Sequence, residues 1–98
     1  MKVLVTGASG LLGSELVSVY RSRDARVVAC DRRALDVTDA SGVRERIASE
    51  APDLVLHCAA YTAVDRAESE SVRAFATNGD GTHNVARACA ATGARLVY

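Results

Sequence analysis

Short, continuous apolar runs alternate along this chain with longer stretches in which apolar residues recur at helical spacing. Such runs are typical of strands that are buried on both faces of a parallel sheet, because these strands have no polar face. They predict strands at 3–6, 26–30, 53–58 and 95–98, and a very short extended piece at 34–37.

The stretches between these runs predict helices that bury one face. The first covers 10–22, with apolar residues at Leu11, Leu12, Leu16, Val19 and Tyr20. The second is capped by Thr38 or Asp39 and ends near Glu50, because Pro52 disfavours helical geometry in the residue before it. Its predicted buried stripe is Ala40, Val43 and Ile47.

The last region between strands predicts a helix that is interrupted. Thr62 and Asp65 have the spacing of a capping box at its start. The run 78–81 (Asn-Gly-Asp-Gly) is expected to break the helix, which resumes near Thr82 and ends before Gly93, a typical C′ residue. The residues expected to face inward after the break are Val85, Ala88 and Cys89.

This order of elements predicts the fold class. Alternating strands and helices imply right-handed crossovers, and therefore a parallel sheet with helices on both faces. We expect an α/β, Rossmann-like sheet that stops after the start of the strand at 95–98. A chain of 98 residues allows one domain at most.

Charge and cysteine content narrow the function classes. The 12 basic and 12 acidic side chains give zero net charge without a basic face, so nucleic acid is not an expected partner. No apolar run approaches the roughly 20 residues of a membrane helix, and no signal peptide is evident, so we expect a cytoplasmic protein. Cys30, Cys58 and Cys89 form no Cys-x-x-Cys pair, which argues against a disulfide framework and a metal site.

The strongest chemical signal is the run Gly7-Ala8-Ser9-Gly10-Leu11-Leu12-Gly13, which follows the first strand and opens the first helix. Gly7 allows a tight turn, Gly10 lets the backbone approach a pyrophosphate, and Gly13 lets the helix pack close to the sheet. The N–H groups of the first helical turn, from Ser9 to Leu12, would then hold the phosphates. The alternative is a glycine-rich turn that serves only chain geometry.

The end of the second strand bears on coenzyme choice. Asp31 is placed to accept the hydroxyl hydrogens of an adenosine ribose, which favours NAD. Arg32 and Arg33 favour NADP, because a guanidinium beside the ribose pairs with a 2′-phosphate. Both coenzymes therefore stay open, and a solvated charged turn is the alternative interpretation.

These motifs together resemble a known family. The glycine run and the stretches 34–39, 59–68 and 78–84 resemble the extended short-chain dehydrogenase/reductases. The stretch 59–68 (Ala-Ala-Tyr-Thr-Ala-Val-Asp-Arg-Ala-Glu) is most similar to the dTDP-4-dehydrorhamnose reductases, which reduce the 4-keto group of a dTDP-sugar on the way to dTDP-L-rhamnose. The resemblance covers the whole chain, but only the N-terminal portion of such an enzyme.

The resemblance implies roles for further residues. Asp36 and Val37 would contact the adenine ring, and Asn78 would support a water link toward a catalytic lysine. A loop beside the ribose and pyrophosphate would be formed by Ala59, Ala60, Tyr61 and Thr62. The alternatives are that Asp36 is a turn residue and that Asn78 breaks a helix. His57 stands where this family usually has asparagine, and we interpret it as a strand-end histidine with its hydrogen bonds satisfied.

Carbonyl reduction in this superfamily uses a Tyr-x-x-x-Lys pair, which this chain lacks, because its only lysine is Lys2. We therefore expect 1–98 to be the NAD(P)-binding portion of such a reductase, with no catalytic residue of its own. The dTDP-sugar would bind only in the full-length enzyme, and a homodimer is a further expectation. The alternatives are a non-catalytic NAD(P)-binding regulatory module and a fragment of an NAD-dependent sugar-nucleotide epimerase or dehydratase.

Overall fold

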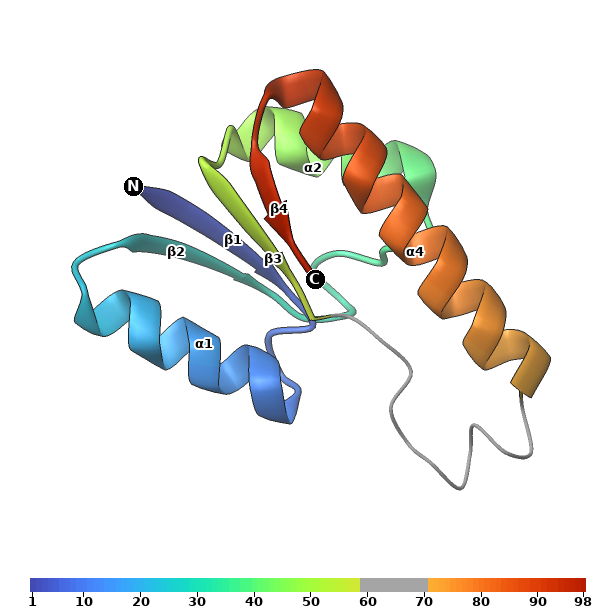
Figure 1. Cartoon of the computed structure of the whole chain (residues 1–98), viewed down its shortest axis with the longest axis horizontal. Helices are drawn as coiled ribbons and strands as arrows, with labels where there is room; N and C mark the ends of the chain where they lie inside the picture. The colour runs from blue at the N-terminus through green and yellow to red at the C-terminus, as the bar shows by residue number, and fades with distance from the viewer. Residues whose placement is uncertain (59–70) are drawn as a thin grey trace.

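The computed structural model describes residues 1–58 and 71–98, and for 71–78 it describes the backbone only. A parallel sheet lies at its centre, with strands in the order β2-β1-β3-β4 (Figure 1). These strands are β1 (Lys2–Thr6), β2 (Arg26–Cys30), β3 (Leu54–His57) and β4 (Arg95–Val97). The helices are α1 (Leu11–Ser22), α2 (Ala40–Glu50) and α4 (Ser71–Thr92).

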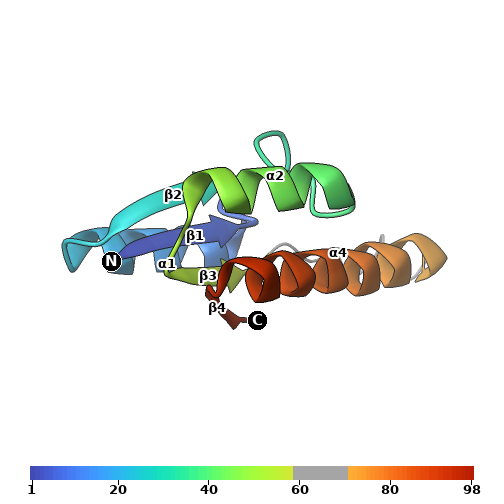
Figure 2. The same cartoon turned by 90° about the horizontal axis from the view of Figure 1, so that it is seen from above.

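Helices cover both faces of the sheet, as the alternation of elements predicts. Helix α1 packs on one face, while α2 and α4 lie side by side on the other (Figures 1 and 2). Strand β1 shows why its sequence is apolar throughout. Val3 and Val5 are buried on the α1 side and Leu4 on the α2/α4 side, so both faces of this strand are in the core. The Rossmann-like prediction is confirmed.

The predicted extended piece at 34–37 is wrong, because the structure has turns over 32–34 and 37–38 and no strand there. Aspartate side chains explain the turns. Asp31 Oδ1 accepts the N–H of Ala34 at 2.9 Å, and Asp36 Oδ1 accepts the N–H of Thr38 at 3.0 Å. Such local bonds stabilise a turn in place of a strand ladder.

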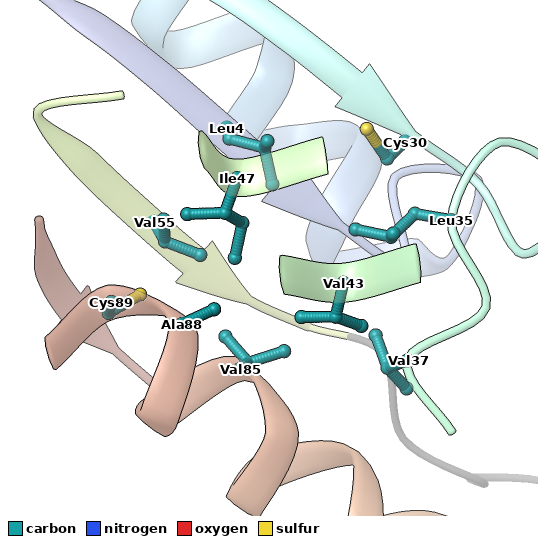
Figure 3. Close-up of a cluster of buried hydrophobic side chains, with 10 residues drawn as sticks. All are labelled: Leu4, Cys30, Leu35, Val37, Val43, Ile47, Val55, Val85, Ala88 and Cys89. Carbon is teal, nitrogen blue, oxygen red and sulfur yellow. The ribbon is translucent and has the colours of Figure 1, made fainter. Parts of the chain in front are cut away.

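The predicted interruption at 78–81 is also wrong, because α4 continues through it. Packing explains the continuity. Gly81 is buried against Val37, and a Cβ on Gly81 would lie 2.7 Å from Val37 Cγ2, so the glycine permits a close contact. Helix α4 ends as predicted, with Gly93 at a φ of +77°. Its inward residues are Val85, Ala88 and Cys89 (Figure 3). The predicted capping box at Thr62 and Asp65 lies outside the described residues.

The buried face of helix α1 differs from the face that its apolar residues predict. Leu11, Leu12 and Val19 are exposed by 88%, 60% and 45%, whereas Gly13 and Val17 face the sheet. Leu16 and Tyr20 pack against the core as partly buried residues. In α2, Val43 and Ile47 are buried as predicted, but Ala40 is exposed at the first turn.

The cysteines are free thiols, with Cys30 and Cys89 buried and Cys58 half-buried. Burial raises the pKa of all three, which keeps them protonated near neutral pH. Among residues 1–58 and 71–98, we find no helix with the length and hydropathy that crossing a bilayer requires.

Candidate functional site

The candidate site lies at the carboxyl edge of the sheet, where β1, β2 and β3 end at Thr6, Cys30 and His57. From β1, the chain crosses to β2 on one side and later to β3 on the other (Figure 1). This reversal is a topological switch point at the ends of β1 and β3. In open α/β sheets, ligands bind at such a switch point.

A tight turn follows β1 at this switch point. Gly7 has a φ of +63°, a left-handed conformation that favours glycine, and its carbonyl accepts the N–H of Gly10 at 3.1 Å. The N–H of Ala8 donates to the Cys30 carbonyl at 3.1 Å, which ties the turn to the end of β2. A Cβ on Gly13 would overlap the carbonyl of Gly7, so only glycine lets α1 pack this close to the turn. The roles predicted for Gly7 and Gly13 in chain geometry agree with these positions.

The N-terminus of α1 follows the glycine turn at this edge of the sheet. Its N-cap is Gly10, which provides no side-chain cap, and its first turn contains no acidic residue. Ser9, Leu11 and Leu12 are exposed around this end of the helix. The helix dipole and the uncapped N–H groups therefore favour an anion here. A Cβ on Gly10 would stand 3.3 Å from the Gly7 carbonyl oxygen, a tight contact within the turn that glycine avoids.

The turn after β2 carries charges of both signs. Asp31 is half-buried, and its Oδ1 is engaged by the Ala34 N–H at 2.9 Å, so the carboxylate is held in place. Arg32 and Arg33 follow it and are exposed. A ribose at this strand end would meet an oriented carboxylate followed by two arginines, a combination compatible with both NAD and NADP.

Asp36 and Val37 lie in the segment that links this turn to α2. Asp36 is exposed between buried neighbours, and its Oδ1 accepts both the N–H and the hydroxyl of Thr38, at 3.0 and 2.6 Å. These two hydrogen bonds lower the pKa of Asp36, so the group is a carboxylate at neutral pH. Val37 is 5% exposed and packs in the α2/α4-side core (Figure 3).

Sequence reasoning missed the contacts of two polar residues, one at the end of β1 and one on α4. Thr6 is fully buried, and its hydroxyl oxygen lies 2.8 Å from His57 Nδ1 and accepts the Cys58 N–H at 3.1 Å. Asn84 on α4 donates from Nδ2 to the Val37 carbonyl at 3.0 Å. A polar residue closing an apolar run is a usable signal for Thr6, whereas the spacing around Asn84 gives none.

Some of the predicted site residues lie together at one edge of the sheet, and others fall outside the described part of the chain. The residues of the glycine turn, together with Asp31 and Arg32, surround the carboxyl edge of the sheet. The predicted loop of Ala59, Ala60, Tyr61 and Thr62 lies outside the described residues. Asn78 belongs to α4, but its side chain is not among those described. The described part of the site nevertheless fits a dinucleotide, because backbone N–H groups, a glycine surface and an anchored carboxylate follow one another along one edge.

Known proteins match this chain from end to end. A family model described as "RmlD substrate binding domain" matches residues 1–98. A dTDP-4-dehydrorhamnose reductase from Streptomyces griseus is 51% identical over 94 residues, which is 96% of this chain and 31% of the relative. One from Mycobacterium tuberculosis H37Rv is 41% identical over 97 residues, which is 99% of this chain and 31% of the relative.

Solved structures agree with this match. A dTDP-4-dehydrorhamnose reductase from Bacillus anthracis in complex with NADP superposes with a TM-score of 0.92 at 39% identity, over 99% of this chain and 35% of that one. A Thermus thermophilus UDP-glucose 4-epimerase in complex with NAD gives a TM-score of 0.92 at 29% identity, over 100% of this chain and 37% of that one. The chain thus spans about a third of the length of these relatives.

Proposed function

The chain belongs to the family described as "RmlD substrate binding domain", and on that premise we propose that it is the dinucleotide-binding region of a reductase. The reaction proposed for the whole protein is reduction of the 4-keto group of a dTDP-linked sugar with NADH or NADPH. The names of the relatives from Streptomyces griseus and Mycobacterium tuberculosis support this substrate class. The complexes of the similar structures with NADP and NAD support the coenzyme.

The observation that carries the proposal is the turn from Gly7 to Gly13. Its glycines would let the backbone approach a pyrophosphate, and the N-terminus of α1, which has no side-chain cap, would supply N–H donors and a positive dipole end. Bound NAD(P)H would supply the hydride. The residues of this chain would bind and orient it, with Ser9, Gly10, Leu11 and Leu12 at the pyrophosphate, and Asp31 and Arg32 at the adenosine ribose.

The proton donor and the sugar site are proposed to lie beyond these residues. Lys2 is the only lysine of the chain, and its Nζ pairs with Glu50 at 3.0 Å at the amino edge of the sheet, opposite the candidate site. It is therefore not placed to assist a tyrosine at the nicotinamide. The loop 59–62, and Asn78 in a supporting role, remain predictions for the nicotinamide side, as do a homodimer and a cytoplasmic location.

Titration of the protein with NADH and NADPH, followed by coenzyme fluorescence, tests the proposal. We expect saturable binding that Gly10→Val weakens by at least about 10-fold, because a branched side chain would occupy the surface that faces the pyrophosphate. Gly79→Val is the matched control, since a Cβ at Gly79 meets no atom within 4 Å. Equal affinities of the Gly10→Val variant and the unaltered protein would remove the proposed role of the glycine turn.

The substrate class needs a separate experiment with the full-length protein. Oxidation of NADPH is followed at its absorbance band with a dTDP-4-keto-6-deoxy sugar. Epimerisation of UDP-glucose in the presence of NAD causes no net change in the coenzyme, so this comparison reaction is followed by chromatography of the sugar nucleotides. We expect turnover with the keto sugar only. Epimerisation of UDP-glucose without reduction of the keto sugar would show that the protein is an epimerase and not a reductase.

A further inference from the structure

The segment between β2 and α2 has no regular secondary structure, yet its middle is firmly held. Leu35 and Val37 are each 5% exposed and anchor it in the core (Figure 3). Asp36, which lies between them in the sequence, is exposed. At its end, Asp39 donates its N–H to the Asp36 carbonyl at 3.0 Å and caps α2 by accepting the Gly42 N–H at 3.1 Å. Asp36 therefore projects from a segment whose flanking residues are fixed.

Helix α4 contributes a contact from a distant part of the chain. Asn84 donates from Nδ2 to the carbonyl oxygen of Val37 at 3.0 Å, in a partly buried position. One helical turn earlier, Gly81 lies so close to Val37 that an added Cβ would stand 2.7 Å from Val37 Cγ2. Both contacts act on Val37, one on its carbonyl group and one on its side chain.

The peptide unit that joins Val37 to Thr38 is consequently held at both ends. Its carbonyl accepts from Asn84, and its N–H donates to Asp36 Oδ1 at 3.0 Å. Because the peptide unit is planar, fixing the carbonyl also fixes the direction of the N–H. This peptide unit thereby connects the amide of Asn84 to the Asp36 carboxylate, although no hydrogen bond joins the two side chains directly.

We infer that Asn84 is a positioning residue for adenine recognition, acting through the Val37–Thr38 peptide on the carboxylate of Asp36. This inference rests on the proposed function and on the adenine contact that the family resemblance implies for Asp36, whose carboxylate would accept a hydrogen bond from the exocyclic amino group. Asp36 Oδ1 is already engaged twice by Thr38, so the amino group would be accepted chiefly by Oδ2. A carboxylate held in one orientation distinguishes an amino group from a carbonyl at this position of the base, because it repels the carbonyl.

The test compares NADH with its hypoxanthine analogue, reduced nicotinamide hypoxanthine dinucleotide, in which a carbonyl replaces the adenine amino group. Hydrogen bonds to charged groups are worth about 1.5–3 kcal/mol, so we expect the unaltered protein to prefer NADH by about 10-fold or more. Asn84→Ala is expected to reduce this preference to about 3-fold or less. A loss of stability alone would weaken both ligands equally and leave their ratio unchanged.

A second pair of variants perturbs the same peptide independently. Gly81→Ala would push on Val37 and is expected to reduce the preference as well, whereas Gly79→Ala on the same helix has open space and is expected to preserve it. A double-mutant cycle completes the set. If Asn84 acts through Asp36, Asn84→Ala causes no further loss of preference in an Asp36→Ala background.

The outcomes separate the inference from the proposed function. Reduced preference in the Asn84→Ala and Gly81→Ala variants, with non-additivity toward Asp36→Ala, supports the inference. NADH binding with an unchanged preference in both variants overturns the inference and leaves the proposed function standing. Failure of the unaltered protein to bind either dinucleotide overturns both.

Discussion

The hydroxyl oxygen of Thr6 lies 2.8 Å from Nδ1 of His57, at the point where β1 and β3 end side by side. The same oxygen accepts the N–H of Cys58 at 3.1 Å, so side chains as well as the strand ladder join these two ends. His57 is half-buried, and burial lowers its pKa below the ordinary value of 6.5. The folded protein therefore favours the neutral imidazole.

This lowered pKa predicts a pH dependence of stability. Between pH 6.5 and the lower pKa of the folded state, the unfolded chain binds more protons at His57 than the folded chain does. We therefore expect the free energy of unfolding to be highest above pH 6.5 and to fall as the pH decreases through this window. Urea denaturation at a series of pH values, followed by circular dichroism, measures it. Asp36 and Glu50 have lowered pKa values too, but they act at more acidic pH, because their ordinary values are 3.8 and 4.5.

The His57→Gln variant isolates this contribution, since glutamine does not titrate. We expect its stability to vary less with pH in the window just below pH 6.5. His83 is exposed on α4, so His83→Gln serves as the matched control and is expected to keep the full dependence. The same pH profile in the His57→Gln variant and the unaltered protein would contradict the assignment.

A second prediction concerns the close packing of α1 on the glycine turn. Gly13→Ala places a methyl group onto the Gly7 carbonyl, so helix or turn must shift. We expect a loss of about 1–3 kcal/mol in the free energy of unfolding, the range typical of overpacking. Gly79→Ala, in open space on α4, is expected to increase stability by up to about 1 kcal/mol through helix propensity. Thermal and urea unfolding compare the two variants, and equal effects would refute the packing role of Gly13.

Much of the fold follows from local patterns along the sequence. The strand predicted at 26–30 coincides with β2, and the cap predicted at Asp39 accepts the Gly42 N–H. Gly93 ends α4 with the expected positive φ. In each case, the determining interactions lie within a few residues of one another, so periodicity, capping chemistry and glycine geometry are sufficient.

The errors at α1 and α4 arise where close packing against the backbone or another segment, and not the spacing of apolar residues, decides the outcome. The rotation of α1 is set by Gly13 against the Gly7 carbonyl, and this leaves Leu11 exposed despite its apolar side chain. The helix continues through Gly81 because that residue faces Val37. The hydrogen bond from Asn84 to Val37 spans 47 positions, and no pattern in a single sequence pairs the two residues.

The N-terminus of α2 supplies a third prediction. Asp39 Oδ1 accepts the Gly42 N–H at 3.1 Å and satisfies a donor that the helix leaves unpaired. We expect Asp39→Ala to lower the free energy of unfolding by about 1 kcal/mol, whereas Asp39→Asn, which keeps a side-chain oxygen, is expected to have little effect. Chemical denaturation of both variants measures the difference. A similar loss in the asparagine variant would show that charge, rather than capping, is responsible.

Coenzyme preference gives the last prediction, which centres on Asp31. Its Oδ1 accepts the Ala34 N–H at 2.9 Å, and the amide oxygen in the Asp31→Asn variant can keep this bond while the charge is lost. Removing the negative charge relieves its repulsion of a 2′-phosphate and leaves Arg32 to attract it. We expect the ratio of NADPH to NADH affinity to rise by about 10-fold, measured by parallel fluorescence titrations at low salt. Asp24→Asn removes an equal charge from the turn between α1 and β2, at the opposite end of the sheet, and is expected to leave the ratio unchanged. A ratio that moves equally in both variants would mean that net charge, and not a ribose beside Asp31, governs the preference.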